Sequence, residues 1–237
     1  MPFIYPIPDM LSPEMTARLT ARLALSDVPW VDGKGSAGRD ATKKHNQEVD
    51  PTSKLRFEIA GMVQGALTDM VRKQALQLQY LADPVKMSPT LISRTGVGGG
   101  YDDHVDNNHL SPHTPNEMRA DLSMTIFLSD PSSYDGGELV IDSDMAFAPS
   151  FKMPVGSAVV YATTSVHRVN PVTRGDRLAA VMWFESRISD PHLREINADL
   201  LECLNALATD PGFEQESTKR VMIKLEKVRA NLIKGFA

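Results

Sequence analysis

The spacing of apolar residues predicts two helices in the first third of the chain. Ser12 followed by Pro13 has the form of an N-cap and a first helical position, and we expect this helix to end at about Leu25. A second helix is expected from about Thr52 to the mid-seventies, because its apolar residues recur with the 3.6-residue period of a helix. That apolar face consists of Leu55, Ile59, Met62, Val63, Ala66, Leu67 and Met70.

The pattern changes to that of strands between about Met87 and Trp183. Apolar residues there alternate with polar ones or form short runs, each bounded by Gly, Pro, Asp or Ser. The candidate strands are TLISRT, DLSMTIFLS, GELVID, SFKM, GSAVVYAT, HRVNPV and RLAAVMWFES. Short strands without helices between them are typical of an antiparallel sandwich or barrel. Together with the helices they predict an α+β fold.

Residues 30–51, between the two predicted helices, have a different composition. Three glycines within this segment and the two prolines that flank it argue against any regular element. The segment is 22 residues long, which is more than a simple connection needs. We therefore expect residues 30–50 to form a lid over a substrate site.

Helical spacing returns after Ile188, so we expect a larger domain of residues 1–187, with its β core starting at about residue 87, and a C-terminal helical extension of residues 188–237. One face of the last predicted helix holds Val221, Leu225, Val228 and Leu232. Basic residues fill its other faces. This helix can pack on its own domain, contact a second copy of the chain to form a homo-oligomer, or bind an acidic partner.

Charge and composition exclude several classes of protein. The formal net charge is −5, so the basic surface of a nucleic-acid-binding protein is not expected. Residues 218–237 alone carry +5, which leaves −10 for the other residues. The single cysteine, Cys203, excludes an intramolecular disulfide and suits a reducing compartment, which indicates the cytoplasm. Its leucine-rich surroundings predict that Cys203 is buried.

Export and membrane insertion are not expected. The first residues, MPFIYPIPDML, contain prolines where a signal peptide has a basic segment followed by a continuous apolar run. No run of 18 apolar residues, the length that a membrane-spanning helix needs, occurs in the sequence.

Three residues form a candidate metal site. His104 and Asp106 are two positions apart, and on an extended chain their side chains point to the same side. Alone, this pair could equally be a solvated surface turn, and His167, in a later strand, could be a buried structural histidine. Together, two imidazoles and one carboxylate form the facial triad that suits Fe(II) and leaves coordination positions open.

Arg177 strengthens this interpretation. It starts the strand RLAAVMWFES, and the period of two places Ala179, Val181 and Trp183 on the same face. The result is a cationic group at one end of an apolar groove. A guanidinium there can bind a carboxylate through two parallel hydrogen bonds, which fits a dicarboxylate whose other end chelates the metal.

Other catalytic motifs are absent from the sequence. The glycines at positions 96, 98, 99 and 100 do not have the spacing of a phosphate-binding loop, and no G-x-S-x-G or H-E-x-x-H motif occurs. His109 and His113 follow the candidate ligands, but loop histidines are usually exposed, so we leave both outside the site. Whether either contacts substrate is left open.

The order of these motifs resembles a known family. HVD, GGELVI, SVHRVNPVTRGDR and an aromatic strand ending in WFES are similar to motifs of the Fe(II)- and 2-oxoglutarate-dependent dioxygenases. Within this family the chain most resembles the prolyl-4-hydroxylase-like branch and its bacterial PKHD-type hydroxylases. The likeness covers roughly residues 4–200. Ser93, Arg94 and Thr95 depart from it, because relatives often carry a tyrosine in this strand.

The resemblance implies a fold, a site and a reaction. The fold is a double-stranded β-helix, or jelly roll, with supporting N-terminal helices. The iron ligands are His104, Asp106 and His167, and Arg177 binds the C5 carboxylate of 2-oxoglutarate. The reaction uses O2, releases succinate and CO2, and hydroxylates an unidentified substrate, with ascorbate as a candidate reductant. The carboxylate of Asp106 favours hydroxylation, because related halogenases lack it.

Two other functions are compatible with the same residues. The first is a metal-dependent, cupin-like enzyme that does not use 2-oxoglutarate. The second is a catalytically silent β-helix that serves as a binding module. Arg177 speaks against the first alternative, because only a 2-oxoglutarate enzyme needs a carboxylate-binding arginine there. An intact set of metal ligands speaks against the second.

Overall fold

A computed structural model describes residues 4–73, 84–142, 144–209 and 215–236. The chain forms two compact units. The first unit consists of Met1–Asp69 and Ser88–Trp183, and the second of Met70–Met87 and Phe184–Ala237.

The first unit contains a larger and a smaller sheet. Strands of the larger sheet are hydrogen-bonded in the order β1 (Ile4–Ile7), β14 (Ala158–Ala162), β10 (Leu122–Phe127), β17 (Arg177–Ser186), β6 (Leu91–Thr95), β4 (Gln47–Val49) and β2 (Trp30–Asp32). The smaller sheet has the order β13 (Ser150–Phe151), β12 (Leu139–Ile141), β15 (His167–Val169), β7 (Gly100–His104) and β3 (Lys44–His45). Two short ladders pair β11 (Asp135–Gly136) with β16 (Val172–Arg174), and β8 (His109–Leu110) with β9 (Met118–Arg119).

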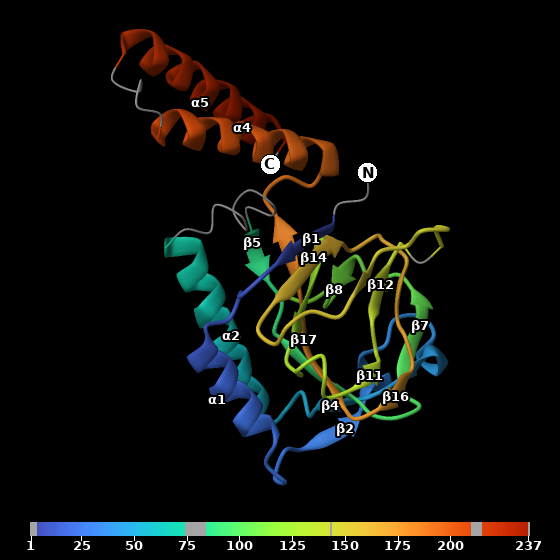
Figure 1. Cartoon of the computed structure of the whole chain (residues 1–237). Coiled ribbons are helices and arrows are strands. Elements are labelled where there is room, and N and C mark those ends of the chain that lie inside the picture. The colour runs from blue at the N-terminus through green and yellow to red at the C-terminus, as the bar shows by residue number, and fades with distance from the viewer. Residues whose placement is uncertain (1–3, 74–83, 143, 210–214, 237) are drawn as a thin grey trace. The chain divides into compact units, whose positions relative to one another are not determined.

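The two sheets lie on opposite sides of a common interior (Figure 1). Side chains from both sheets form one core cluster, which consists of Phe127, Leu139, Ile141, Val159 and Tyr161. β14 pairs antiparallel with β1 and β10, and β15 pairs antiparallel with β12 and β7. The predicted antiparallel sandwich is therefore confirmed, and each of the seven candidate strands contains a strand of the structure.

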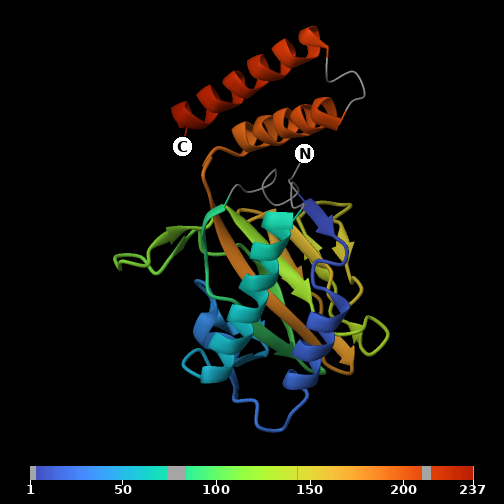
Figure 2. The same ribbon diagram turned by 90° about the vertical axis from the view of Figure 1, so that its left-hand side faces the viewer.

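Both predicted N-terminal helices are present. Helix α1 (Pro13–Leu23) begins after Ser12, whose hydroxyl accepts a hydrogen bond from the backbone N–H of Met15. Helix α2 spans Lys54–Lys73. In the first unit the two helices lie along one face of the larger sheet (Figure 2). Their sheet-facing side is buried, as Leu19 and Ile59 show with no exposed surface.

The prediction that residues 30–51 contain no regular element is wrong. This segment forms β2, two 3-10 helices, η1 (Gly33–Ser36) and η2 (Ala41–Lys43), and then β3 and β4. Gly33 and Gly35 lie in η1, while the strands pair with distant segments: β4 pairs with β6, and β3 pairs with β7. The sequences of β2, β3 and β4, which are WVD, KH and QEV, contain few apolar residues, so no apolar run or alternation marks them as strands.

The second unit contains β5 (Pro84–Met87), which pairs with the end of β17, and helices α4 (Pro191–Thr209) and α5 (Glu216–Phe236). The Arg229 guanidinium on α5 donates a hydrogen bond to Asn197 on α4. Cys203 on α4 is exposed, so the prediction that it is buried is wrong. The buried residues of α4 are Arg194, Asn197 and Leu204, and none of them is Cys203.

The predicted apolar face of α5 is divided. Leu225 and Leu232 are half-buried, whereas Val221 and Val228 are exposed. Among the described residues, no helix is both long enough and apolar enough to cross a membrane.

Candidate functional site

One cavity of the first unit is lined by residues from both sheets. All four residues that the sequence singled out, His104, Asp106, His167 and Arg177, line it. The cavity extends along β17, which starts with Arg177 and carries Trp183 six positions later. At about 3.3 Å per residue, these two backbone positions are about 20 Å apart.

The smaller sheet brings the two histidines together. His104 ends β7 and His167 begins β15, and the two residues are direct partners in the register of these strands. Asp106 lies two residues beyond the end of β7. Its Oδ1 is 3.7 Å from the Nε2 of each histidine. One ligand atom from each of the three side chains lies within 4.8 Å of the others, so the three could hold a metal ion.

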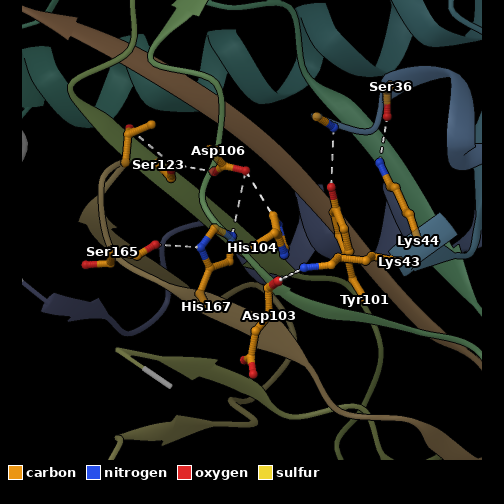
Figure 3. Close-up of polar contacts among 12 residues, drawn as sticks. Ser36, Lys43, Lys44, Tyr101, Asp103, His104, Asp106, Ser123, Ser165 and His167 are labelled. Atoms are coloured by element: carbon orange, nitrogen blue, oxygen red, sulfur yellow. Dashed lines mark hydrogen bonds and ion pairs between the residues drawn. The ribbon is translucent and has the colours of Figure 1, made fainter. Parts of the chain in front are cut away.

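Backbone carbonyls orient both imidazoles. The Nδ1 of His104 is 2.8 Å from the carbonyl oxygen of Asp102. The Nδ1 of His167 is 3.0 Å from the carbonyl oxygen of Ser165, as Figure 3 shows. A carbonyl only accepts hydrogen bonds, so each Nδ1 must carry the hydrogen. The lone pair is therefore on Nε2, the atom that faces Asp106.

The surroundings of His104 favour its neutral form. Burial lowers its pKa to about 4, and repulsion from a charged His167 acts in the same direction. A metal ion binds neutral imidazole. At neutral pH His104 is thus in the form that a metal requires.

The second oxygen of Asp106 is held by two donors from the larger sheet. The Ser123 hydroxyl on β10 donates to Oδ2 at 2.8 Å, and the indole Nε1–H of Trp183 on β17 donates to the same atom at 2.9 Å. Sequence reasoning placed Trp183 along the groove but missed both hydrogen bonds. The alternating pattern of β17 gave the direction of the indole, but not its partner.

Arg177 is a buried cation whose donors are incompletely used. It is 3% exposed, and its Nε has no hydrogen-bond partner among the residues that the structure describes. Its guanidinium carbon lies 5.8 Å from the ring centre of Phe127, and burial lowers its pKa. A buried charge of this kind is costly unless an anion pairs with it. The cavity therefore suits an anionic ligand.

Gly137 leaves the space that Arg177 occupies. Its φ is +67°, a conformation that other residues adopt only with strain. A Cβ at this position would lie 3.0 Å from the Cδ of Arg177 and 3.0 Å from a ring carbon of Tyr134. The glycine at position 137 thus permits Arg177 to lie between the two sheets.

Residues 30–50 form part of the cavity wall. The Lys44 ammonium donates to the hydroxyl of Ser36 at 2.6 Å and to the carboxylate of Glu48, and both Lys44 and Glu48 are buried. The Gly38 N–H donates to the Tyr101 hydroxyl, and the ring of Tyr101 is stacked on His104. This segment is thus tied to the strand that carries a triad histidine. A role as a substrate lid remains a prediction.

His109 and His113 lie outside the triad. His109 is in the β8–β9 hairpin, 3.5 Å from the carboxylate of Glu117, and both of these side chains are about half exposed. His113 is also exposed. Their placement agrees with leaving them out of the metal site.

The fold and the triad define a class of proteins, the metal-dependent oxygenases built on a double-stranded β-helix. Residues 90–185 match the model of the 2OG-Fe(II) oxygenase superfamily. A PKHD-type hydroxylase of Hyphomonas neptunium is 37% identical over 90% of this chain and 91% of its own. One of Klebsiella pneumoniae is 38% identical over 90% of this chain and 92% of its own. The chain belongs to the 2OG-Fe(II) oxygenase superfamily, among its PKHD-type hydroxylases.

Solved structures are similar in fold. A prolyl-4-hydroxylase of Pseudomonas putida has a TM-score of 0.53 at 17% identity, covering 78% of this chain and 94% of its own. A prolyl hydroxylase of Trichoplax adhaerens, solved with a peptide fragment of the hypoxia-inducible factor, has a TM-score of 0.57 at 12% identity, covering 81% and 86%. These likenesses show a jelly-roll core. Membership of the family makes the protein an oxygenase that depends on Fe(II) and 2-oxoglutarate.

Proposed function

We propose that this oxygenase hydroxylates a carbon of its substrate with an iron ion held by His104, Asp106 and His167. The observation that carries the proposal is the convergence of both Nε2 atoms on Oδ1 of Asp106, at 3.7 Å each. When bound, iron and 2-oxoglutarate supply the oxidative chemistry, with release of succinate and CO2. Asp106 favours hydroxylation because its carboxylate would occupy the coordination position of the iron that a halide would need.

Arg177 is proposed to bind the far carboxylate of 2-oxoglutarate. Its burial and its unpaired Nε support this role, because a carboxylate would supply the missing partner. Apolar residues such as Leu139 and Val181 line the space beside it. Their contribution is to exclude water, which strengthens the ion pair.

The substrate is proposed to be either a protein side chain or a small metabolite. The titles of the solved neighbours name prolyl hydroxylases, which makes a prolyl side chain one candidate. A comparison of peptide and metabolite libraries, scored by succinate formation above the background rate, would separate the two classes. Ascorbate as the reductant is a further proposal, which the same assay tests by omission.

Two wider proposals concern the whole chain. The single cysteine supports a cytoplasmic protein. The exposed Val221, Ile223 and Val228 on the basic helix α5 support a contact with a second copy. Acidic residues on α4, among them Glu195, Asp199 and Glu202, offer a complementary surface. A hydrodynamic mass equal to that of a monomer, unchanged when residues 211–237 are removed, would contradict the self-association.

Anaerobic binding tests the proposed function directly. Fe(II) together with 2-oxoglutarate should give the weak visible charge-transfer band of an iron-bound 2-oxo acid. An absent band would favour a cupin-like enzyme that does not use 2-oxoglutarate, if Fe(II) still binds. Loss of both would favour a catalytically silent binding module. Arg177→Ala should weaken 2-oxoglutarate binding, and an unchanged affinity would contradict the assignment of Arg177.

A further inference from the structure

The Oδ2 oxygen of Asp106 has two donors that no part of the proposed reaction requires. Oδ2 of Asp106 accepts from Ser123 at 2.8 Å and from Trp183 at 2.9 Å. A carboxylate oxygen has two lone pairs available to donors, so these two hydrogen bonds occupy it. Oδ1 is left as the atom that faces both histidines.

We propose that Trp183 and Ser123 are positioning residues that decide which oxygen of Asp106 binds the iron. The inference rests on the proposed function, because it concerns the same metal site. Each donor holds Oδ2 on the side of the larger sheet. A carboxylate without these donors can turn about its last bond and present either oxygen, or both, to the ion. With the donors in place, one oxygen is available and its direction is fixed.

The donors come from two strands in the interior of the larger sheet. Ser123 lies on β10, Trp183 on β17, and β10 is hydrogen-bonded between β14 and β17 in the larger sheet. The backbone of Trp183 exchanges two hydrogen bonds with Ser88, both of 2.9 Å. Asp106, in contrast, lies in the loop after β7, which belongs to the smaller sheet. The two hydrogen bonds thus tie a loop residue to the opposite sheet.

Ser123 is itself oriented. It has no exposed surface, and its hydroxyl lies 3.2 Å from the hydroxyl of Thr163. A serine hydroxyl has one hydrogen, and an ionised carboxylate can only accept. When this hydrogen is donated to Asp106, the oxygen of Ser123 is left to accept from Thr163. The contact with Asp106, at 2.8 Å, is the shorter of the two, and a charged acceptor makes the stronger hydrogen bond, so Ser123 acts as a donor to the metal ligand.

Trp183→Phe and Ser123→Ala test the inference. Trp183→Phe keeps an aromatic ring but removes the N–H, and Ser123→Ala removes the hydroxyl. We expect each to weaken Fe(II) binding by about tenfold or more, the usual effect of losing a partner of a metal ligand. The charge-transfer band of the anaerobic complex with Fe(II) and 2-oxoglutarate should also shift, because the coordinating carboxylate changes. The double variant should lose less than the two separate losses combined, since both donors bind one atom.

Trp30→Phe is the matched control. Trp30 is the other tryptophan of the chain, and its ring contacts Arg94 on the larger sheet rather than the triad. This variant should keep the iron affinity and the band of the wild type. Ser123→Thr, which restores a hydroxyl, should recover iron affinity relative to Ser123→Ala. Thermal unfolding of each metal-free variant shows whether that variant folds. If Trp183→Phe does not fold, Ser123→Ala and Ser123→Thr decide the question.

The outcomes separate this inference from the proposed function. A wild-type band together with unchanged iron affinity and band position in Trp183→Phe and Ser123→Ala would overturn the positioning role and leave the proposed function intact. A wild-type protein that gives no band would contradict the proposed function, and the positioning role with it. Weaker iron binding and a shifted band in both variants, with Trp30→Phe unchanged, would support the inference.

Discussion

The two ends of the cavity treat their polar atoms in opposite ways. At the triad, the outward-facing atoms Nδ1 of His104, Nδ1 of His167 and Oδ2 of Asp106 all have hydrogen-bond partners in the protein. At the other end, Arg177 is buried with its Nε unpaired. The outer atoms of the triad thus have hydrogen-bond partners before any ion binds, whereas the Nε of Arg177 would gain its partner only from a bound ligand. We expect the triad to be rigid without metal and the arginine end to gain most from ligand binding.

The largest effect is expected from removing a triad ligand. Asp106→Ala should lower iron affinity by more than about 100-fold, because losing even an outer partner of a ligand costs 10- to 100-fold. Hydroxylation should fall to background. Anaerobic Fe(II) titration measures the loss, and Asp103→Ala, which removes a more exposed carboxylate nearby, is the control. Wild-type iron affinity in Asp106→Ala would remove Asp106 from the site.

Arg177→Met tests the other end and should have two opposite effects. Binding of 2-oxoglutarate should weaken by about 30-fold or more, as expected when one partner of a buried charge pair is removed. The ligand-free protein should become more stable, because an unpaired buried charge is replaced by an apolar side chain of similar length. Isothermal titration and thermal unfolding measure the two effects.

Arg174→Met is the control for this experiment. Arg174 precedes Arg177 by three residues and forms an exposed pair with Asp135. It should change neither property appreciably. If Arg177→Met destabilised the ligand-free protein, the contrast between the two ends would be wrong.

Gly137→Ala should disturb the arginine end while sparing the triad. A Cβ here meets Arg177 and Tyr134 at 3.0 Å and would have to adopt a φ of +67°. We expect a loss of about 1–3 kcal/mol in the free energy of unfolding and a higher KM for 2-oxoglutarate. Gly35→Ala is the control, because nothing lies within 4 Å of its Cβ position. A raised KM for 2-oxoglutarate with normal iron affinity would support the separation of the two ends of the cavity, whereas weaker iron binding would contradict it.

The smallest effect concerns pH and the metal-free protein. An unfolded histidine binds a proton near pH 6.5, but His104 in the folded protein does so only near its lowered pKa of about 4. Above pH 6.5 both states are neutral and His104 contributes nothing. As the pH falls from 6.5 to about 4, the unfolded state gains protons first, so the free energy of unfolding of the metal-free protein should decrease.

Urea unfolding at pH 7 and pH 4.5 measures this drop. His104→Gln should reduce it, because the residue that titrates is then absent. Arg177 stays charged throughout this range and contributes no dependence on pH. An equal drop in His104→Gln and in the wild type would assign the effect to other groups.

Sequence patterns predicted the β core because each of its segments contains an apolar run or alternation bounded by turn residues, even where the strand itself has only two or three residues. The four site residues were predicted from their residue types and from the order of their motifs. The hydrogen bonds to Asp106 could not be predicted from the sequence. Their donors are 17 and 77 positions away in the sequence, and no local pattern connects such residues. Asp106 also lies beyond β7 rather than on it, so its direction comes from these tertiary contacts as well as from the pleat.

The prediction that residues 30–51 contain no regular element was wrong for a related reason. Glycines and short strands with few apolar residues give this segment the sequence pattern of a loop. Its strands β4 and β3 form by pairing with β6 and β7, which lie far along the chain. The prediction that Cys203 is buried was wrong because its leucine-rich neighbours do not reveal which side of α4 is covered. In each case the missing information is which surface a distant segment provides.

The direct pairing of His104 with His167 across β7 and β15 makes the site a property of strand alignment rather than of chain length. A slip of one residue between these strands would turn one imidazole to the opposite face of the sheet. The turns between the two histidines can therefore lengthen or shorten during evolution without moving the metal ligands. The same freedom offers protein engineers insertion points for new substrate-binding loops, provided that the alignment of these two strands is kept.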